Sequence, residues 1–153
     1  MDFMKEAIKE SAKNIATGDG GPFGAVVVRD GHIIGRGHNE VLVNHDPTCH
    51  GEMQAIRDAC RHLGTHDLTG CELYTSAEPC PMCLSAIIWA NIKTVYYGNT
   101  AQDAAAIGFR DDFIYKYIED GRKDCSTLVL KQMDRQEAIK VFQAYSDKKM
   151  TLY

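Results

Sequence analysis

Two short motifs, about thirty residues apart, contain residue types that could hold a metal ion and move a proton. They are His50-Gly51-Glu52 and Glu78-Pro79-Cys80-Pro81-Met82-Cys83. One imidazole and two thiolates make three ligands for Zn²⁺, and catalytic zinc sites leave the fourth position to water. A carboxylate that is not needed as a ligand could then carry a proton. The pattern predicts hydrolytic chemistry at one Zn²⁺ ion held by His50, Cys80 and Cys83, with Glu52 as the catalytic proton carrier.

Both motifs fall where the sequence predicts the start of a helix. Apolar residues at helical spacing predict one helix over about 50–62, and Pro81 suits the first turn of another. The free N–H groups of a helix N-terminus stabilise a thiolate. His50 and Glu52 are two residues apart, so on a regular helix they would point to different sides. They converge only if the helix begins there.

The rest of the chain alternates between helical and strand patterns. Helical spacing predicts a helix over 2–17, and the Asp30-Gly31 turn joins two short strands into a hairpin. Further strands are expected at 71–75, 94–97 and 126–130, and one or two short helices at 100–119 with a break near Gly108. The apolar stretch 84–90 should be a helix buried on several sides, and a last helix follows a capping-box pattern at Asp134, with an apolar inner stripe at 138–145.

This order of elements predicts an α/β fold of three layers, α/β/α, around a central mixed five-stranded sheet. Helical crossovers make the later strands run parallel. In such sheets the chemistry gathers beyond the strand ends, where helices begin. With 153 residues, 44% of them hydrophobic, the chain is expected to form one domain over 1–153.

Composition narrows the classes of partner and compartment. The formal net charge of −4 gives no general attraction for nucleic acids or membrane surfaces. The acidic N-terminus does not resemble a secretory signal, and no stretch is long enough to span a bilayer. A cytoplasmic protein is expected, so its six cysteines are interpreted as thiols or metal ligands. Cys60, Cys71 and Cys125 are predicted to be core residues.

Other interpretations of the two motifs stay open at this stage. The Cys80–Cys83 pair alone could be a redox dithiol. A closed structural zinc site would need a fourth ligand, for which the available side chains are Cys49, His45 and Asp46. Glu52 could be an ordinary acid of a helix first turn. Phe23 and Asn39 could likewise be ordinary turn residues.

Longer stretches around the motifs resemble the cytidine deaminase superfamily, and within it the small guanine deaminases. The shared motifs lie at Gly20–Val26, Asp46–Glu52, Leu73–Cys83 and Ile87–Ala90. The segment from Gly108 to Lys116 and the tail from Phe142 to Tyr153 are similar to guanine deaminases in particular. The resemblance implies hydrolytic removal of the 2-amino group of guanine, which gives xanthine and ammonia.

The same resemblance implies roles for individual residues. His50, Cys80 and Cys83 would hold the zinc, and Glu52 would shuttle a proton from water to the ring nitrogen and then to the leaving amine. The residues expected to meet the substrate are Asn39 at the purine edge, Phe23, Trp89 and Gly51 around the base, Asp111 at the amine, and Tyr153. The resemblance also implies a homodimer in which C-terminal segments, about 134–153, are exchanged, so that Tyr153 completes the partner's pocket.

Two departures from the family pattern concern the substrate and leave the zinc chemistry unchanged. Gly51 replaces the alanine usual in that branch, and the run Arg110-Asp111-Asp112 offers two aspartates for one role. Cytosine deaminase and tRNA adenosine deaminase share the zinc motifs and are the enzymatic alternatives. A structural zinc-binding interaction module is the alternative without catalysis.

Overall fold

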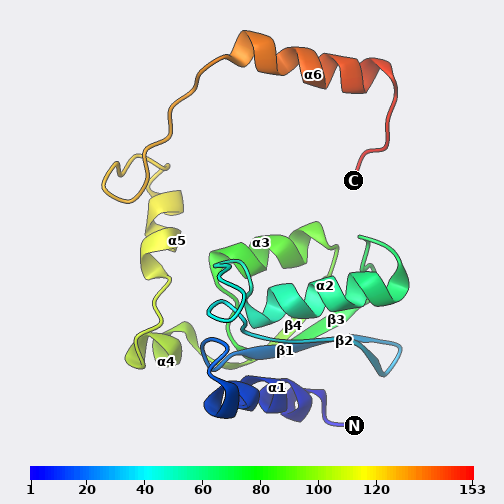
Figure 1. Ribbon diagram of the computed structural model, residues 1–153, viewed down its shortest axis with the longest axis vertical. Helices are drawn as coiled ribbons and strands as arrows, with labels where there is room; N and C mark the ends of the chain where they lie inside the picture. Colours follow the sequence, from blue (N-terminus) through cyan, green and yellow to red (C-terminus); the bar gives the residue numbers. More distant parts are fainter. The chain divides into compact units, whose positions relative to one another are not determined.

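A mixed sheet of four strands organises the first part of the computed structural model, which describes residues 1–153 (Figure 1). The chain divides into two compact units, Met1–Ile114 and Tyr115–Tyr153, and the sheet belongs to the first. Its strands stand in the order β2-β1-β3-β4. Their bounds are Gly24–Arg29 for β1, His32–His38 for β2, Glu72–Ala77 for β3 and Thr94–Asn99 for β4.

The predicted hairpin and parallel pair are both present. β1 pairs antiparallel with β2 and with β3, whereas β3 and β4 run parallel. Asp30 and Gly31 join β1 to β2 with φ angles of 48° and 75°. Both central residues therefore adopt the positive φ that a tight hairpin turn requires, which is the reason for an Asp-Gly pair at this position.

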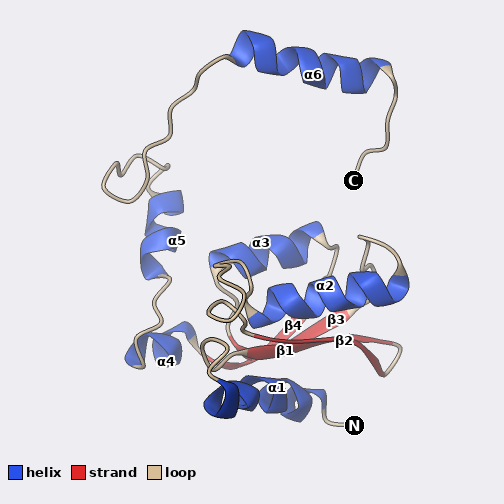
Figure 2. Ribbon diagram, viewed as in Figure 1, coloured by secondary structure: helices blue, strands red, loops and turns tan.

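Helices cover both faces of the sheet, as the three-layer prediction requires (Figure 2). Helix α1, Phe3–Thr17, covers one face, and helices α2, Gly51–Leu63, and α3, Pro81–Trp89, cover the other. The side chains of β1 alternate between the two cores. Ala25 and Val27 pack in the larger core with α2 and α3, and Val26 and Val28 pack with α1.

Two glycines in β2 let α2 lie close to the sheet. A Cβ atom on Gly35 would come within 2.4 Å of the main-chain oxygen of Ala55, and one on Gly37 within 2.4 Å of the Ala55 nitrogen. The absence of a side chain at both positions allows the helix backbone to rest on the strand. This close contact fixes the position of α2, and with it the position of the His50 motif at its start.

The prediction of a fifth strand is wrong. Residues 126–130 form no strand, and Leu128, Val129 and Leu130 are exposed. A strand is stable only when it pairs with another, and no strand of the chain pairs with this segment. β4 accordingly pairs with β3 alone and forms an edge of the sheet.

Two short helices follow β4, as predicted. Helix α4 covers Ala101–Ala106 and helix α5 covers Asp112–Glu119, with Gly108 at a φ of 102° between them. α3 is less buried than its apolar sequence indicates, since Leu84, Ile88 and Trp89 are exposed. The prediction that this helix is buried on several sides is therefore wrong within a single chain. No helix of the chain has both the length and the apolar character to cross a bilayer.

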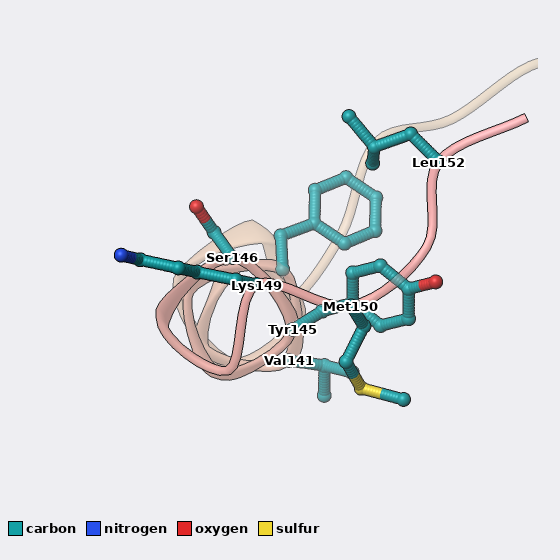
Figure 3. A pocket seen from close by; sticks show the side chains of 7 residues that line it. Val141, Tyr145, Ser146, Lys149, Met150 and Leu152 are labelled. Carbon is teal, nitrogen blue, oxygen red and sulfur yellow. The ribbon is translucent and has the colours of Figure 1, made fainter.

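The second unit contains helix α6, Arg135–Asp147, and the C-terminal residues. The predicted capping box is absent, because Asp134 has a φ of 52° and its side chain makes no capping hydrogen bond. The predicted apolar stripe exists on α6 but is exposed, and Cys125 is exposed as well, against the prediction of a core residue. A groove beside α6, shown in Figure 3, is lined by Val141, Phe142, Tyr145, Ser146, Lys149, Met150 and Leu152.

Candidate active site

The two motifs meet in space through the side chains of His50, Cys80 and Cys83. The Nδ1 atom of His50 lies 3.5 Å from the sulfur of Cys80 and 3.5 Å from the sulfur of Cys83. A tetrahedral zinc ion with ordinary bond lengths separates its nitrogen and sulfur ligands by about 3.5 Å. The ligand atoms of the three side chains all lie within 4.8 Å of one another. The group therefore has the spacing and the donor types to hold one Zn²⁺ ion.

Helix starts place these ligands. His50 is the N-cap residue of α2 and Cys80 is the N-cap residue of α3, and both have extended backbone angles. Pro81 follows in the first turn of α3, where its missing N–H costs nothing. Two helix N-termini with free N–H groups thus face the metal-binding group, and their partial positive charge favours an ionised sulfur.

The electrostatics of the group favour a thiolate. A hydrogen bond from Cys83, assisted by His50, lowers the pKa of Cys80 to about 4. The contact with Cys80, followed by burial, raises the pKa of the Cys83 thiol. The interaction with Cys80 also raises the pKa of His50. The lowered pKa of Cys80 favours an ionised sulfur, which is the ligand form that a metal cation needs.

Glu52 lies beside the metal-binding group without belonging to it. α2 begins at Gly51, so His50 is outside the helix and Glu52 is in its first turn, the arrangement that allows the two side chains to converge. The Glu52 side chain is buried, and burial raises the pKa of its carboxyl group. The Cys83 thiol lies within hydrogen-bonding reach of the carboxylate. A raised pKa suits a carboxylate that must accept and release a proton near neutral pH.

The three side chains considered as possible fourth zinc ligands, those of Cys49, His45 and Asp46, do not join the metal-binding group. The sulfur of Cys49 lies near the side chains of Asn44 and Arg57. Asp46 accepts hydrogen bonds from the main chain and hydroxyl of Thr48, and His45 is exposed. No fourth His, Cys, Asp or Glu joins the metal-binding group. The chain would therefore supply three zinc ligands, as in a catalytic centre, and not the four of a structural zinc site.

Asn39, Phe23 and Gly51 come together next to the start of α2. The main-chain N–H of Asn39 donates to the carbonyl of Phe23 at 2.9 Å. A Cβ atom on Gly51 would stand 3.1 Å from that same carbonyl and 3.0 Å from the Cα of Gly24. An alanine here would need its neighbours to move by a few tenths of an ångström. The structure thus brings three of the predicted substrate residues together beside the start of α2. Their roles in binding the substrate stay predictions.

The two aspartates after Arg110 have different surroundings. Asp112 is exposed and forms an ion pair with Arg110 at 2.8 Å, so its carboxylate is engaged by a neighbour. Asp111 is partly buried. Burial raises the pKa of the Asp111 carboxyl group, and the negative charge of Cys80 raises it further. Asp111 is therefore the aspartate within electrostatic reach of the metal-binding group.

Two other predicted substrate residues, Trp89 and Tyr153, are exposed in the single chain. Trp89 is the last residue of α3, and its side chain is 71% exposed. Cys83 and Trp89 are six residues apart on the same helix, which corresponds to about 9 Å along its axis. Tyr153 belongs to the second unit and is also exposed. The substrate contacts of both side chains stay predictions.

The structure also shows supporting residues that the sequence analysis did not identify. Asn14 on α1 donates hydrogen bonds to the carbonyls of Gly21 and Asn39. Phe109 makes an edge-to-face contact with Phe23, with ring centroids 5.1 Å apart. The one available signal for Asn14 was a polar residue in a helix with an apolar face. Nothing in the local sequence marks the contact made by Phe109.

A third supporting residue is Thr75 on β3, whose hydroxyl lies 2.9 Å from a carboxylate oxygen of Glu52. It falls in the middle of a strand where threonine is common. Its sequence position therefore gave no reason to single it out.

Comparison with known proteins gives a consistent result. Residues 1–99 match the family described as the cytidine and deoxycytidylate deaminase zinc-binding region. Guanine deaminase of Bacillus subtilis is 48% identical over 143 residues, which cover 94% of this chain and 91% of that protein. The X-ray structure of guanine deaminase from Bacillus subtilis matches with a TM-score of 0.87 at 46% identity, covering 95% of this chain and 92% of that chain.

More distant relatives match a shorter part of the chain. A tRNA-specific adenosine deaminase of Aquifex aeolicus is 44% identical over 95 residues, 62% of each protein. A solved structure of a mutant protein in complex with 8-azaguanine matches with a TM-score of 0.68 at 39% identity, covering 71% of this chain and 63% of that one. The family match over residues 1–99 includes the metal-binding group and Glu52. The chain therefore belongs to the zinc-binding cytidine and deoxycytidylate deaminase family.

Proposed function

We propose that this protein is a zinc-dependent hydrolase that deaminates guanine to xanthine and ammonia. The observation that carries the proposal is the buried carboxylate of Glu52 beside a three-ligand group with no fourth protein ligand. The 48% identity to a guanine deaminase over 94% of the chain supports guanine as the base. The complex of a related protein with 8-azaguanine supports a free purine base as the class of substrate.

Each residue of the site has a proposed part in the reaction. Zn²⁺ bound by His50, Cys80 and Cys83 would act as a Lewis acid and lower the pKa of water. Glu52 takes one proton from the attacking water and passes it to the ring nitrogen. It then takes the second proton of that water, now the hydroxyl on the attacked carbon, and gives it to the amine, so that ammonia leaves and the hydroxyl oxygen becomes the carbonyl of xanthine. The buried position of Glu52 supports this assignment, because a carboxylate with a raised pKa both accepts and donates a proton readily.

We propose that the remaining residues bind the base and assist departure of the amine. Asn39 hydrogen-bonds the purine edge while Phe23 and Gly51 line the pocket. Asp111 assists at the amine, which its partial burial and its interaction with Cys80 support. Trp89 also lines the base pocket, and Tyr153 completes the pocket of the partner in the proposed dimer.

For the assembly we propose a homodimer in which residues of about 134–153 are exchanged, so that two copies together complete each deaminase domain. Three features support exchange: an apolar face on α6 that is exposed in one chain, an edge strand β4 that pairs on one side, and the apolar segment Leu128–Leu130 without a strand partner. We also propose a cytoplasmic location, which the six unpaired cysteines support.

Ammonia release from a panel of substrates tests the proposed function. The zinc-loaded protein is incubated with guanine, cytosine, adenine and guanosine, and ammonia is measured for each. We expect guanine to be the best substrate. Preference for cytosine would identify a cytosine deaminase, and no release from any base would contradict the proposal. Salt-sensitive binding of tRNA together with release from its adenosine would identify a tRNA adenosine deaminase instead.

A further inference from the structure

We propose that Thr75 is a positioning residue that holds the carboxylate of Glu52 in the orientation needed for proton transfer, an inference that rests on the proposed function. Thr75 lies in β3 and is completely buried. Its hydroxyl oxygen is 2.9 Å from Oε1 of Glu52, whose side chain is 5% exposed. The hydrogen bond therefore joins two buried groups from different elements, β3 and the first turn of α2.

Thr75 supplies a hydrogen bond to this carboxylate from the central strand β3. A glutamate side chain has several rotatable bonds, and restricting them requires specific contacts. The hydrogen bond from Thr75 restricts the position of the carboxylate relative to the metal-binding group. Loss of the Thr75 contact would leave one oxygen without its anchor.

The anchor lies in a strand that is itself held in place. The single proton of the Thr75 hydroxyl has two acceptors within reach, the Glu52 carboxylate and, at 3.0 Å, the main-chain carbonyl of Ala77, and the ionised carboxylate is the stronger acceptor. β3 is paired on both sides, and Thr75 stands opposite Ala25 of β1 and Tyr97 of β4. A site residue on a doubly paired strand moves little, which is the support that precise proton transfer requires.

Substitutions at this position separate the hydroxyl from the volume it occupies. Thr75→Val keeps a similar shape and removes the hydroxyl, whereas Thr75→Ser keeps the hydroxyl and removes a methyl group. If Thr75 only filled space, the serine variant would be the more damaging of the two. If it positions Glu52, the valine variant is the more damaging for turnover.

The experiment compares zinc content, kcat, KM and the crystal structure of the zinc-loaded variants. We expect Thr75→Val to bind one zinc per chain, to keep KM for guanine within about threefold, and to lower kcat by about 10- to 100-fold. Thr75→Ser should keep kcat within about threefold. In a Glu52→Gln background the same valine substitution should change the residual turnover by less than about twofold, because residues that act through one another are not additive. The zinc-loaded Thr75→Val crystal should show the Glu52 carboxylate displaced.

Several results would overturn the inference. They are loss of zinc from Thr75→Val, equal losses in the native and Glu52→Gln backgrounds, a serine variant as slow as the valine variant, or an unmoved Glu52 carboxylate. Should Thr75→Val fail to fold, Thr75→Cys has a similar volume and a weaker donor, and the same comparisons apply to it. If the native protein releases no ammonia from guanine, the proposed function fails, while the position of the carboxylate in the variant crystal still decides the role of Thr75.

Discussion

The side-chain amide of Asn14 donates a hydrogen bond to the main-chain carbonyl of Asn39 at a distance of 2.9 Å. The same amide donates to the carbonyl of Gly21 at 2.6 Å. One buried residue on α1 therefore holds both the glycine-rich loop before β1 and the segment after β2. The predicted base-binding side chain of Asn39 depends on this connection, although Asn14 stands on the opposite face of the sheet from α2.

Removal of the Asn14 amide should weaken the fold and substrate binding together. Asn14→Ala leaves two carbonyls without their donor, so we expect a loss of about 1–3 kcal/mol in the free energy of unfolding. We also expect KM for guanine to rise more than kcat falls. Urea unfolding and steady-state kinetics measure these effects, with the exposed Lys5→Ala on the same helix as the control. Unchanged stability in Asn14→Ala would show that the two hydrogen bonds do not hold this segment.

The two adjacent aspartates should differ strongly in their effect on activity. Asp111→Asn should lower kcat/KM for guanine by about 10- to 100-fold, because its partly buried carboxyl group interacts electrostatically with Cys80 of the metal-binding group. Asp112→Asn, which removes an exposed ion pair with Arg110, should change kcat/KM by less than about twofold. The two variants carry the same change of charge. A larger effect from Asp112→Asn would reverse the assignment.

Asp46 should contribute stability that depends on pH. Hydrogen bonds from the hydroxyl and main chain of Thr48 lower the pKa of Asp46 below 3.8, its unfolded value. A carboxyl group with a lowered folded pKa stabilises the protein above its unfolded pKa, and the contribution is lost as pH falls through the folded pKa. The difference in unfolding free energy between the native protein and Asp46→Asn should therefore be largest near neutral pH and should shrink below pH 3.8.

Urea unfolding of the two metal-free proteins between pH 3 and pH 7 measures this difference. Metal-free protein is used because the ligands would otherwise release zinc as they are protonated. The other titrating groups are the same in both proteins, so their contributions cancel. A difference that stays constant across this range would show that the ionised Asp46 carboxylate does not stabilise the loop before His50.

Segment exchange predicts that two inactive variants restore each other. Glu52→Gln disables the site of its own chain and keeps its tail, whereas Tyr153→Ala keeps the site and disables the tail. In an exchanged dimer, the hybrid contains one complete site, so an equal mixture assembled together should regain about a quarter of the native activity. If each tail served its own chain, no activity would return. The two homodimers measured alone provide the controls.

The sequence predicted the features of the fold that depend on local chemistry. The Asp30-Gly31 turn requires positive φ, and the starts of α2 and α3 follow from the His50 and Pro81 motifs, so local residues were sufficient for these elements. The spacing of His50, Cys80 and Cys83 also predicted a three-ligand group, because both ligand segments stand at helix N-termini. Zinc-ligand chemistry leaves few alternatives to that arrangement.

Most failures concern features that depend on partners far away or outside the chain. The capping box predicted at Asp134 is a local feature, and it is absent because Asp134 adopts a φ of 52°. Residues 126–130 have the composition of a strand, but a strand also needs a neighbour, and composition does not say whether the neighbour is in the same chain. The predictions that α3 is buried on several sides and that the apolar stripe of α6 faces inward fail for the same reason. Thr75 and Asn14 were missed because a single polar residue in a strand or helix has no local signature, and its importance appears only in its contacts.

The central claim is that Glu52 transfers protons at a zinc ion held by His50, Cys80 and Cys83. The test is to measure ammonia release from guanine and the amount of zinc bound per chain. Both are measured for the native protein, the chelator-treated protein and the Glu52→Gln variant. Native activity should disappear with the metal and return with added zinc. The Glu52→Gln variant should bind one zinc per chain but be slower by about 100-fold or more. Full turnover by Glu52→Gln, or by the metal-free protein, would contradict the account.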